Sequence, residues 1–265
     1  MQLHFQKMLG AGNKILIVDQ RAADPITPDE NILDALREAS SSEGFDQLMW
    51  LHRAQDPEAE AAYRVFNYDG SEVEQCGNGA RCVSVLLASQ NPGLQEFSLE
   101  SPAGRLQARV SNLERAYVDM GAPEFDDAVT RLSVNGSEID VGIVSMGNPH
   151  CVLEVADLQV ADVAGLGPAI ESHELFPNRS NVGFMQVVDR ANIKLRVFER
   201  GVGETLACGT GACAAVALGI RRGQLDEDVA VHLPGGQLVV SWRGMDASIW
   251  LSGDVEFISE GTIDL

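Results

Sequence analysis

The chain of 265 residues lacks several features that would place it in a common class of protein. No apolar run is long enough to span a membrane, and the start, MQLHFQKMLG, has no apolar segment typical of a secretion signal. Its five cysteines form no Cys-x-x-Cys, which argues against a zinc ribbon and against a disulfide framework. We therefore expect a cytoplasmic protein whose cysteines are reduced.

Positive charge is scarce as well. Lysine and arginine total 19 against 39 aspartates and glutamates, which gives a net charge of -20. Neither nucleic acid nor an anionic membrane is an expected partner for such a chain. A small acidic substrate would need local positive potential in its site. The hydrophobic content of 45% is enough for well-packed cores, and the length fits two lobes or one large domain.

The most informative feature that is present is a motif that occurs twice. Residues 66–80 read FNYDGSEVEQCGNGA and residues 198–212 read FERGVGETLACGTGA, so that Cys76 and Cys208 lie 132 positions apart. The same offset relates Glu-Phe at 124–125 to Glu-Phe at 256–257. Upstream, Gly12-Asn13 matches Gly147-Asn148, and Gly44-Phe45-x-Gln47 matches Gly183-Phe184-x-Gln186. Such order indicates an internal repeat.

The repeat predicts an α+β fold with two pseudo-symmetric lobes. Each lobe is expected to be a mostly antiparallel sheet or barrel around a central helix, and the active site is expected in the cleft between the lobes. Helices are predicted over 77–89 and 209–221, and a further helix is predicted to start at Thr27-Pro28-Asp29-Glu30, with Thr27 as its cap. The N-terminal lobe (1–126) carries Cys76, the C-terminal lobe (127–257) carries Cys208, and a tail (258–265) returns to the N-terminal lobe.

Both repeated cysteines immediately precede a predicted helix. Free amides and the helix dipole at that position favour a thiolate and lower the thiol pKa. The glycines let a substrate carboxylate approach bare backbone N–H groups, and that carboxylate can share the charge of a carbanion on the adjacent carbon. One thiolate would accept the α-proton and the other thiol would donate to the opposite face. The pattern predicts a racemase or epimerase without pyridoxal phosphate or another cofactor, and without a metal.

Other interpretations of the same residues are weaker. A single cysteine in a glycine-rich turn is more often a small buried hydrophobe, but two at equivalent positions favour chemistry. Gly209-x-Gly211-x-x-Ala214 fits a loose dinucleotide fingerprint, without a convincing βαβ unit around it. No Gly-Lys-Ser/Thr of a phosphate-binding loop is present. The remaining cysteines have no repeat partner and are interpreted as structural; they are Cys82, Cys151 and Cys213.

The repeat breaks where Asn67-Tyr68 aligns with Glu199-Arg200. A reacting centre can be handled symmetrically, but the rest of a chiral substrate cannot. We therefore expect Arg200 to bind a second carboxylate through its planar fork, and Glu199 to accept from an ammonium group. The alternative is a solvated Glu-Arg pair at a strand end.

The repeated blocks resemble the diaminopimelate epimerase family, and the resemblance runs almost end to end. The shared blocks include KMxGxGN at 7–13, GFDQL at 44–48, SMGNPHC at 145–151 and NVGFMQVV at 181–188, in addition to the two cysteine blocks. The resemblance implies interconversion of LL- and meso-diaminopimelate, on the route to lysine and peptidoglycan, and a homodimer is the assembly expected in this family. Cys76 and Cys208 would be the acid/base thiols.

The resemblance also implies which residues hold the substrate, a small amino acid with two carboxylates. The backbone amides of Gly77, Asn78, Gly209 and Thr210 would hold the reacting α-carboxylate. Glu199 and His150 would lie near the reacting amine. The remainder of the substrate would be held by Asn13, Gln47, Asn67, Asn148, Asn181 and Arg200, with Arg200 on the distal carboxylate.

The chain departs from the family pattern near its start. Many members have His, Asp and Phe where this chain has Leu9, Lys14 and Ile15. Asn13 is kept, so that the expected substrate contact is retained, but the altered loop could change which amino acid fits.

Three competing functions remain at the level of sequence. They are a racemase of another amino acid or a proline-type racemase or dehydratase of the same superfamily, a non-enzymatic binding protein, and a redox protein with a Cys76–Cys208 disulfide.

Overall fold

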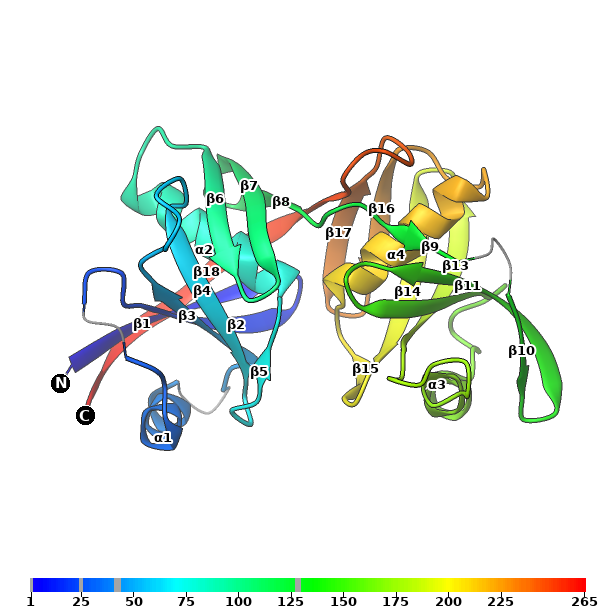
Figure 1. The fold of residues 1–265 in the computed structure, drawn as a ribbon, viewed down its shortest axis with the longest axis horizontal. Helices are drawn as coiled ribbons and strands as arrows, with labels where there is room; N and C mark the ends of the chain where they lie inside the picture. The colour runs from blue at the N-terminus through cyan, green and yellow to red at the C-terminus, as the bar shows by residue number, and fades with distance from the viewer. Residues whose placement is uncertain (1, 24–25, 41–43, 127–129) are drawn as a thin grey trace. The chain divides into compact units, whose positions relative to one another are not determined.

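The computed structural model describes residues 2–23, 26–40, 44–126 and 130–265. The chain forms two compact units, each with its own core (Figure 1). Unit 1 comprises Met1–Val118 and Ser252–Leu265, and unit 2 comprises Asp119–Leu251. The sequence analysis put the boundaries after residues 126 and 257, later in the chain than these. Residues 127–129, at the predicted joint, lie outside the described residues.

An exchange of strands explains where the units begin and end. Strand β9 (Glu124–Phe125) closes the first half of the repeat, but it pairs with β11 (Ser137–Ser145) of unit 2. Strand β18 (Trp250–Asp264) closes the second half, but it pairs with β1 (Gln2–Gly10) of unit 1, from Gly10↔Val255 to Gln2↔Asp264. Each half of the repeat therefore supplies its last strand to the unit formed by the other half.

Unit 1 is built from a closed ring of strands. Within the described residues the pairing runs through eight strands and returns to its start, in the order β1, β2, β3, β4, β6, β7, β8 and β18. The pairs β2–β3 and β4–β6 are parallel. The remaining bounds are β2 (Asn13–Asp19), β3 (Gln47–His52), β4 (Ala61–Asn67), β5 (Glu72–Val73), β6 (Glu96–Ser101), β7 (Gly104–Asn112) and β8 (Arg115–Asp119).

Unit 2 repeats this pairing pattern. Its parallel pairs are β12–β13 and β14–β16, and antiparallel pairs connect β10–β11–β12, β13–β14–β15 and β16–β17. The bounds are β10 (Thr130–Val134), β12 (Pro149–Glu154), β13 (Asn181–Asp189), β14 (Asn192–Glu199), β15 (Gly203–Thr205), β16 (Asp228–Leu233) and β17 (Gly236–Ser241).

Strand register gives the residue-by-residue correspondence between the units. The row Leu16–Leu48–Phe66 in unit 1 corresponds to the row Cys151–Val182–Phe198 in unit 2. The pairs that come one residue earlier in these strands also correspond: Ile15–Gln47 in unit 1 and His150–Asn181 in unit 2. The equivalent of Gln47 is therefore Asn181, and the match of Gln47 with Gln186 drawn from sequence is wrong. The two Gly-Phe-x-Gln strings lie at non-equivalent positions, the first mostly before β3 and the second within β13.

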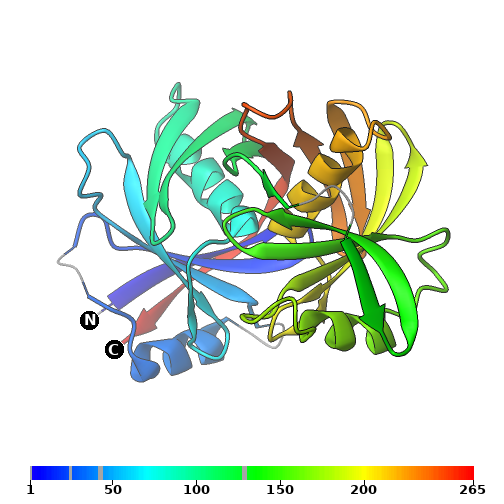
Figure 2. The ribbon, with the colours of Figure 1, turned by 45° about the vertical axis from the view of Figure 1, so that its right-hand side comes forward.

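Each unit encloses one helix, as predicted. In α2 (Gly77–Gln90) every residue from Gly77 to Ala88 is buried, and in α4 (Gly209–Arg221) every residue from Gly211 to Gly219 is buried (Figure 2). Small and apolar residues on all sides of these helices let the strands pack around them. The fold is therefore α+β with two similar units, each a sheet wrapped around a central helix.

Two further helices lie on the outside of the units. Helix α1 (Glu30–Ala39) packs Leu33 and Leu36 into the core of unit 1, and α3 (Val163–Glu171) packs Ile170 into that of unit 2. The predicted start of α1 is wrong by two residues. Asp29, not Thr27, is the N-cap, because its carboxylate accepts the amide hydrogen of Ile32 at 3.0 Å. No described helix is both long enough and apolar enough to cross a membrane.

Candidate active site

Cys76 and Cys208 occupy the same backbone position in their units. Cys76 is the N-cap of α2, with φ -138° and ψ 105°, and Cys208 is the N-cap of α4, with φ -127° and ψ 110°. The first intrahelical bonds are Ala80 N–H to Cys76 O at 2.8 Å and Ala212 N–H to Cys208 O at 3.0 Å. The amides of Gly77, Asn78, Gly209 and Thr210 come before these bonds and have no intrahelical partner, so that they can bind an anion.

The glycines after each cysteine leave room at the helix ends. A Cβ on Gly79 would lie 2.3 Å from Met49 Sδ, whereas a Cβ on Gly211 would lie 3.1 Å from Val197 Cγ2. Any larger side chain would therefore displace its neighbours. The four residues that resemblance assigned to the α-carboxylate all lie in these first turns; they are Gly77, Asn78, Gly209 and Thr210.

Unit 1 surrounds Cys76 with side-chain amides. Cys76 Sγ donates to Gln47 Oε1 at 2.6 Å and accepts from the backbone N–H of Gly79 at 3.2 Å. Asn13 Nδ2 donates to the same Gln47 oxygen at 3.3 Å, and Gln47 Nε2 donates to Asn67 Oδ1 at 3.2 Å. The structure thus brings Asn13, Gln47 and Asn67 together beside Cys76, from strands β2, β3 and β4.

Asn78 is placed differently from those three amides. Its side chain is buried, and Oδ1 accepts from Arg81 Nη2 at 2.8 Å. Arg81 is fully buried and also donates to the carbonyl of Gly77 at 3.4 Å. The sequence analysis missed Arg81, although the repeat contained a signal, because the equivalent position in unit 2 is Cys213. A buried guanidinium therefore fixes the first turn of α2, and the first turn of α4 has no arginine at the equivalent position.

Unit 2 surrounds Cys208 with a different set of groups. Cys208 Sγ lies 3.6 Å from Thr210 Oγ1, which accepts from Asn148 Nδ2 at 3.4 Å. Asn148 Oδ1 lies 3.0 Å from His150 Nε2. The structure therefore connects Cys208, Thr210, Asn148 and His150, three of which resemblance had assigned to the substrate or its amine.

Burial gives His150 an unusual character. The imidazole is fully buried, and burial followed by the nearby Arg200 charge lowers its pKa from 6.5 to about 3. His150 is therefore neutral at physiological pH and can serve as a hydrogen-bond partner but not as a cation. Its Nδ1 has no protein partner among the described residues.

Glu199 is the last residue of β14, and Arg200 begins the turn that leads to β15. Thr205 Oγ1 donates to Glu199 Oε1, and the backbone N–H of Arg200 donates to Asn181 Oδ1 at 3.0 Å. Arg200 Nη1 donates to the carbonyl of Asn178 at 3.5 Å. No carboxylate of the described residues forms an ion pair with this guanidinium, which leaves its charge available to an anionic ligand.

A second residue that the sequence analysis missed holds the same turn. The Glu171 carboxylate is buried at the end of α3 and accepts the backbone N–H of Gly201 at 2.6 Å. Gly201 has φ 75°, a conformation that side chains other than hydrogen disfavour. No motif identified Glu171, because its partner is a backbone amide distant in sequence.

The prediction that the helix end lowers the thiol pKa and favours a thiolate is wrong for Cys208. Burial, followed by the adjacent Glu199 charge, raises the pKa of the Cys208 thiol well above its ordinary value. Burial also raises the pKa of Glu199, although hydrogen bonds with Thr205 and Cys208 oppose that shift. Desolvation and a like charge therefore outweigh the helix dipole in unit 2.

The altered loop at the start of the chain places Asn13 beside Gln47. Leu9 pairs with Lys14 across the β1–β2 turn, and the backbone N–H of Lys14 donates to Asp46 Oδ2 at 2.7 Å. Ile15 is fully buried. Asn13, next to these replacements, still reaches Gln47.

The other three cysteines have the character expected of structural residues. All five cysteines are buried and reduced, and burial raises the pKa of Cys82 and of Cys151 to about 12. In the described ranges, no group of three or more His, Cys, Asp and Glu side chains is arranged to hold a metal ion.

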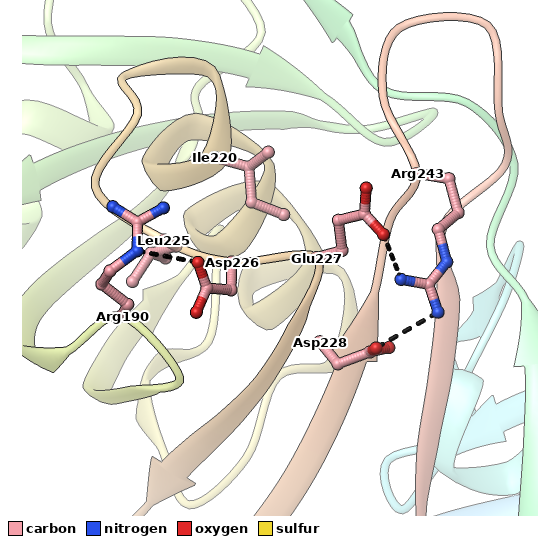
Figure 3. A pocket seen from close by; sticks show the side chains of 7 residues that line it. All are labelled: Arg190, Ile220, Leu225, Asp226, Glu227, Asp228 and Arg243. Carbon is pink, nitrogen blue, oxygen red and sulfur yellow. Dashed lines mark hydrogen bonds and ion pairs between the residues drawn. The ribbon is translucent and has the colours of Figure 1, made fainter.

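A pocket of about 490 Å³ in unit 2 lies apart from the residues just described (Figure 3). Its arginines already have carboxylate partners, since Arg190 pairs with Asp226 at 2.8 Å and Arg243 pairs with Asp228 at 3.1 Å. The lining has two arginines and three carboxylates, and it contains neither Cys76 nor Cys208. Its residues are Arg190, Ile220, Leu225, Asp226, Glu227, Asp228 and Arg243.

Solved structures share this fold over nearly the whole chain. A phenazine biosynthesis protein of the PhzF family from Bacillus anthracis is 17% identical, with a TM-score of 0.74 and full coverage of both chains. A probable proline racemase from Agrobacterium radiobacter, with bound carbonate, is 14% identical, with a TM-score of 0.74 over 99% of this chain and 93% of that one. A predicted epimerase from Pseudomonas aeruginosa is 19% identical, with a TM-score of 0.73 over 98% of this chain and 99% of that one.

The family is shown by sequence. The family model for diaminopimelate epimerase matches residues 5–125 and 142–258, one segment in each half of the repeat. These segments include both cysteine blocks and every candidate site residue named above. The chain belongs to the diaminopimelate epimerase family, a family of isomerases.

Proposed function

We propose that this protein epimerises LL-diaminopimelate to meso-diaminopimelate without a cofactor, with Cys76 and Cys208 as the two acid/base thiols. The observation that carries the proposal is the pair of cysteines at equivalent helix N-caps, each beside first-turn amides. Family membership supports the same reaction. In the cell, this activity would supply precursors of lysine and peptidoglycan.

In the proposed mechanism two half-sites, the residues around Cys76 and the residues around Cys208, act on one substrate. The first-turn amides of α2 and α4 hold the α-carboxylate, which takes up charge as the α-carbon loses its proton. A thiolate on one cysteine removes that proton, and the S–H of the other donates to the opposite face. The carbon is inverted, one thiol and one thiolate remain with their roles exchanged, and no oxidant or further reactant is consumed.

Three groups in unit 2 support a substrate with an amine and a second carboxylate. Arg200 offers a guanidinium without a carboxylate partner among the described residues, in a chain whose net charge is -20. Glu199 offers a largely buried carboxyl, and His150 a neutral imidazole. An arginine fork suits a carboxylate, and a buried carboxyl suits an ammonium group.

The proposal is tested by proton NMR of reduced protein with LL-diaminopimelate in deuterated water. We expect deuterium to enter one α-position as the meso isomer appears. A folded protein with free thiols that exchanges no α-proton would contradict the proposed substrate. Screening other amino acids by the same exchange would then test the alternative, a racemase of another amino acid in this superfamily.

A further inference from the structure

A chain of hydrogen bonds connects the exposed carboxylate of Asp69 to the sulfur of Cys76. Ser71 Oγ donates to Asp69 Oδ1 at 2.6 Å, and Asn67 Nδ2 donates to Ser71 Oγ at 3.1 Å. Gln47 Nε2 donates to Asn67 Oδ1 at 3.2 Å, and Gln47 Oε1 lies 2.6 Å from Cys76 Sγ. All five side chains belong to unit 1.

The carboxylate at the outer end fixes the direction of the first bond. Hydrogen bonds from the Ser71 side chain and backbone hold the pKa of Asp69 below its ordinary value, so that Asp69 is ionised at neutral pH. An ionised carboxylate only accepts. The single hydroxyl hydrogen of Ser71 is therefore committed to Asp69, and Ser71 Oγ can only accept from Asn67.

The direction then propagates inward through two amides. Because Asn67 must present its NH₂ group to Ser71, it presents Oδ1 to Gln47. Gln47 must therefore donate from Nε2 to Asn67 Oδ1, which leaves its carbonyl oxygen Oε1 facing Cys76. A carbonyl oxygen cannot donate, so that the hydrogen of this last contact belongs to sulfur.

We propose that Asp69 and Ser71 are positioning residues that act through Asn67 and Gln47 to hold Cys76 as a protonated thiol in the unliganded site. This inference rests on the proposed function, in which Cys76 is one of the two acid/base thiols. A substrate that engages Gln47 or Asn67 would replace these hydrogen bonds, so that the constraint applies to the free enzyme. A thiol is also less readily oxidised than a thiolate.

In the described part of unit 2, no hydrogen-bond chain from an exposed carboxylate occupies the equivalent positions. The positions that correspond to Asp69 and Ser71 are Gly201 and Gly203, and Asn67 corresponds to Glu199. In unit 2 a carboxyl lies directly beside its cysteine, and it raises the pKa of Cys208 in addition to the effect of burial. Both units therefore place a carboxylate so as to favour the thiol in the free enzyme, at a distance in unit 1 and in contact in unit 2. The thiolate that the proposed reaction needs would form when substrate replaces these hydrogen bonds and one thiol releases its proton to solvent.

The test is the pH dependence of alkylation at each cysteine, measured by peptide mapping after brief treatment with iodoacetamide. In Ser71→Ala the amides of Asn67 and Gln47 are free to reverse, and Gln47 can then donate to a thiolate. We expect Cys76 to be alkylated about fivefold faster at pH 7 than in the wild type, as for one ordinary hydrogen bond. Asp69→Asn should act in the same direction.

Two variants and one internal reference control the measurement. Ser71→Thr keeps the hydroxyl and should retain the wild-type profile, and Ser111→Ala alters an exposed serine of β7 in the same unit. Cys208 in each sample reports any general loosening of the fold. Equal Cys76 profiles in wild type and Ser71→Ala, or a wild-type Cys76 already reacting fully as a thiolate at pH 7, would overturn the proposal.

The measurement needs no substrate, and its result is therefore separate from that of the exchange experiment. If the protein fails to epimerise diaminopimelate but Ser71→Ala shifts the Cys76 profile, the positioning chain stands and the proposed substrate falls. If the protein epimerises diaminopimelate but Ser71→Ala leaves the Cys76 profile unchanged, the proposed reaction stands and the positioning role of Asp69 and Ser71 falls.

Discussion

The two half-sites share a backbone and differ in their side chains. Each has a cysteine at the N-cap of a buried helix and a neighbouring parallel strand pair. Around Cys76 the facing groups are neutral amides. Beside Cys208 they are the Glu199 carboxyl and the Thr210 hydroxyl, to which Asn148 connects the His150 imidazole. The backbone that a symmetric proton transfer requires is repeated, and the side chains that an asymmetric substrate would meet are not.

An ion pair outside the half-sites shows what else the repeat retained. Arg64 pairs with Glu72 at 2.7 Å in unit 1, and Arg196 pairs with Glu204 at 2.6 Å in unit 2, at the same offset as the cysteines. Each pair joins the strand before the turn to the strand after it. These partly exposed pairs contribute little to stability individually, but they fix the turn that leads to each cysteine.

The largest expected effect comes from removing either cysteine. Because inversion needs an acid on one face and a base on the other, Cys208→Ala and Cys76→Ala should each lower epimerisation by about 10²- to 10⁴-fold. The measurement is meso-diaminopimelate formation from the LL isomer. Cys151→Ala, which removes a buried thiol outside both half-sites, should retain turnover. If Cys76→Ala and Cys208→Ala were as active as Cys151→Ala, the two thiols would not be the acid and the base of the reaction.

Arg200 tests the asymmetric side of the comparison. Arg200→Met removes a charged fork from the proposed distal carboxylate site, and we expect KM to rise about 10- to 100-fold because hydrogen bonds to charged groups are the strong ones. Steady-state kinetics separate KM from kcat. Tyr68→Phe, at the equivalent position in unit 1, is the matched control. An unchanged KM in Arg200→Met would place the distal carboxylate elsewhere.

The lowered pKa of His150 predicts that unit 2 is destabilised more than unit 1 as the pH falls. Since its folded pKa of about 3 lies below the ordinary 6.5, the unfolded chain binds the proton more readily. The contribution of neutral His150 to the free energy of unfolding is complete above pH 6.5 and is lost as the pH falls toward 3. At pH 5 the loss should be about 2 kcal/mol of unfolding free energy.

Hydrogen exchange at pH 7 and pH 5 measures this difference unit by unit. Unit 1 has Ile15 at the equivalent position and should lose less protection. His150→Gln should flatten the pH dependence of unit 2, and urea unfolding at both pH values gives its size. Equal pH dependence in the variant and the wild type would contradict the buried neutral imidazole.

The difference between the two units in packing at the helix ends gives the last comparison. A Cβ on Gly79 would meet Met49 at 2.3 Å, whereas one on Gly211 meets its nearest neighbour at 3.1 Å. Gly79→Ala should therefore cost about 1–3 kcal/mol of unfolding free energy, and Gly211→Ala less. Urea denaturation of the two variants compares them directly, and the reverse order would indicate that the core around Met49 is the more adaptable one.

Local sequence was sufficient for the features with a short-range cause. Gly-rich turns followed by small apolar residues predicted α2 and α4, and the repeated Cys-Gly-x-Gly-Ala blocks located both N-caps. The resemblance brought in the amides around Cys76. Prediction failed where the cause was a partner distant in the chain: Gln47 was matched with Gln186, and Glu171 was not identified at all.

The sequence by itself determined that the protein has two similar halves, each with a cysteine at a helix start, because periodicity and helix-start residues are local properties. The tertiary structure alone decided the exchange of β9 and β18, the burial that raises the pKa of Cys208, and the direction of the hydrogen bonds that reach Cys76. These depend on strand pairing, desolvation and the sequence of donors and acceptors in space. No pattern along the chain fixes those quantities, because each is set by residues that only folding brings into contact.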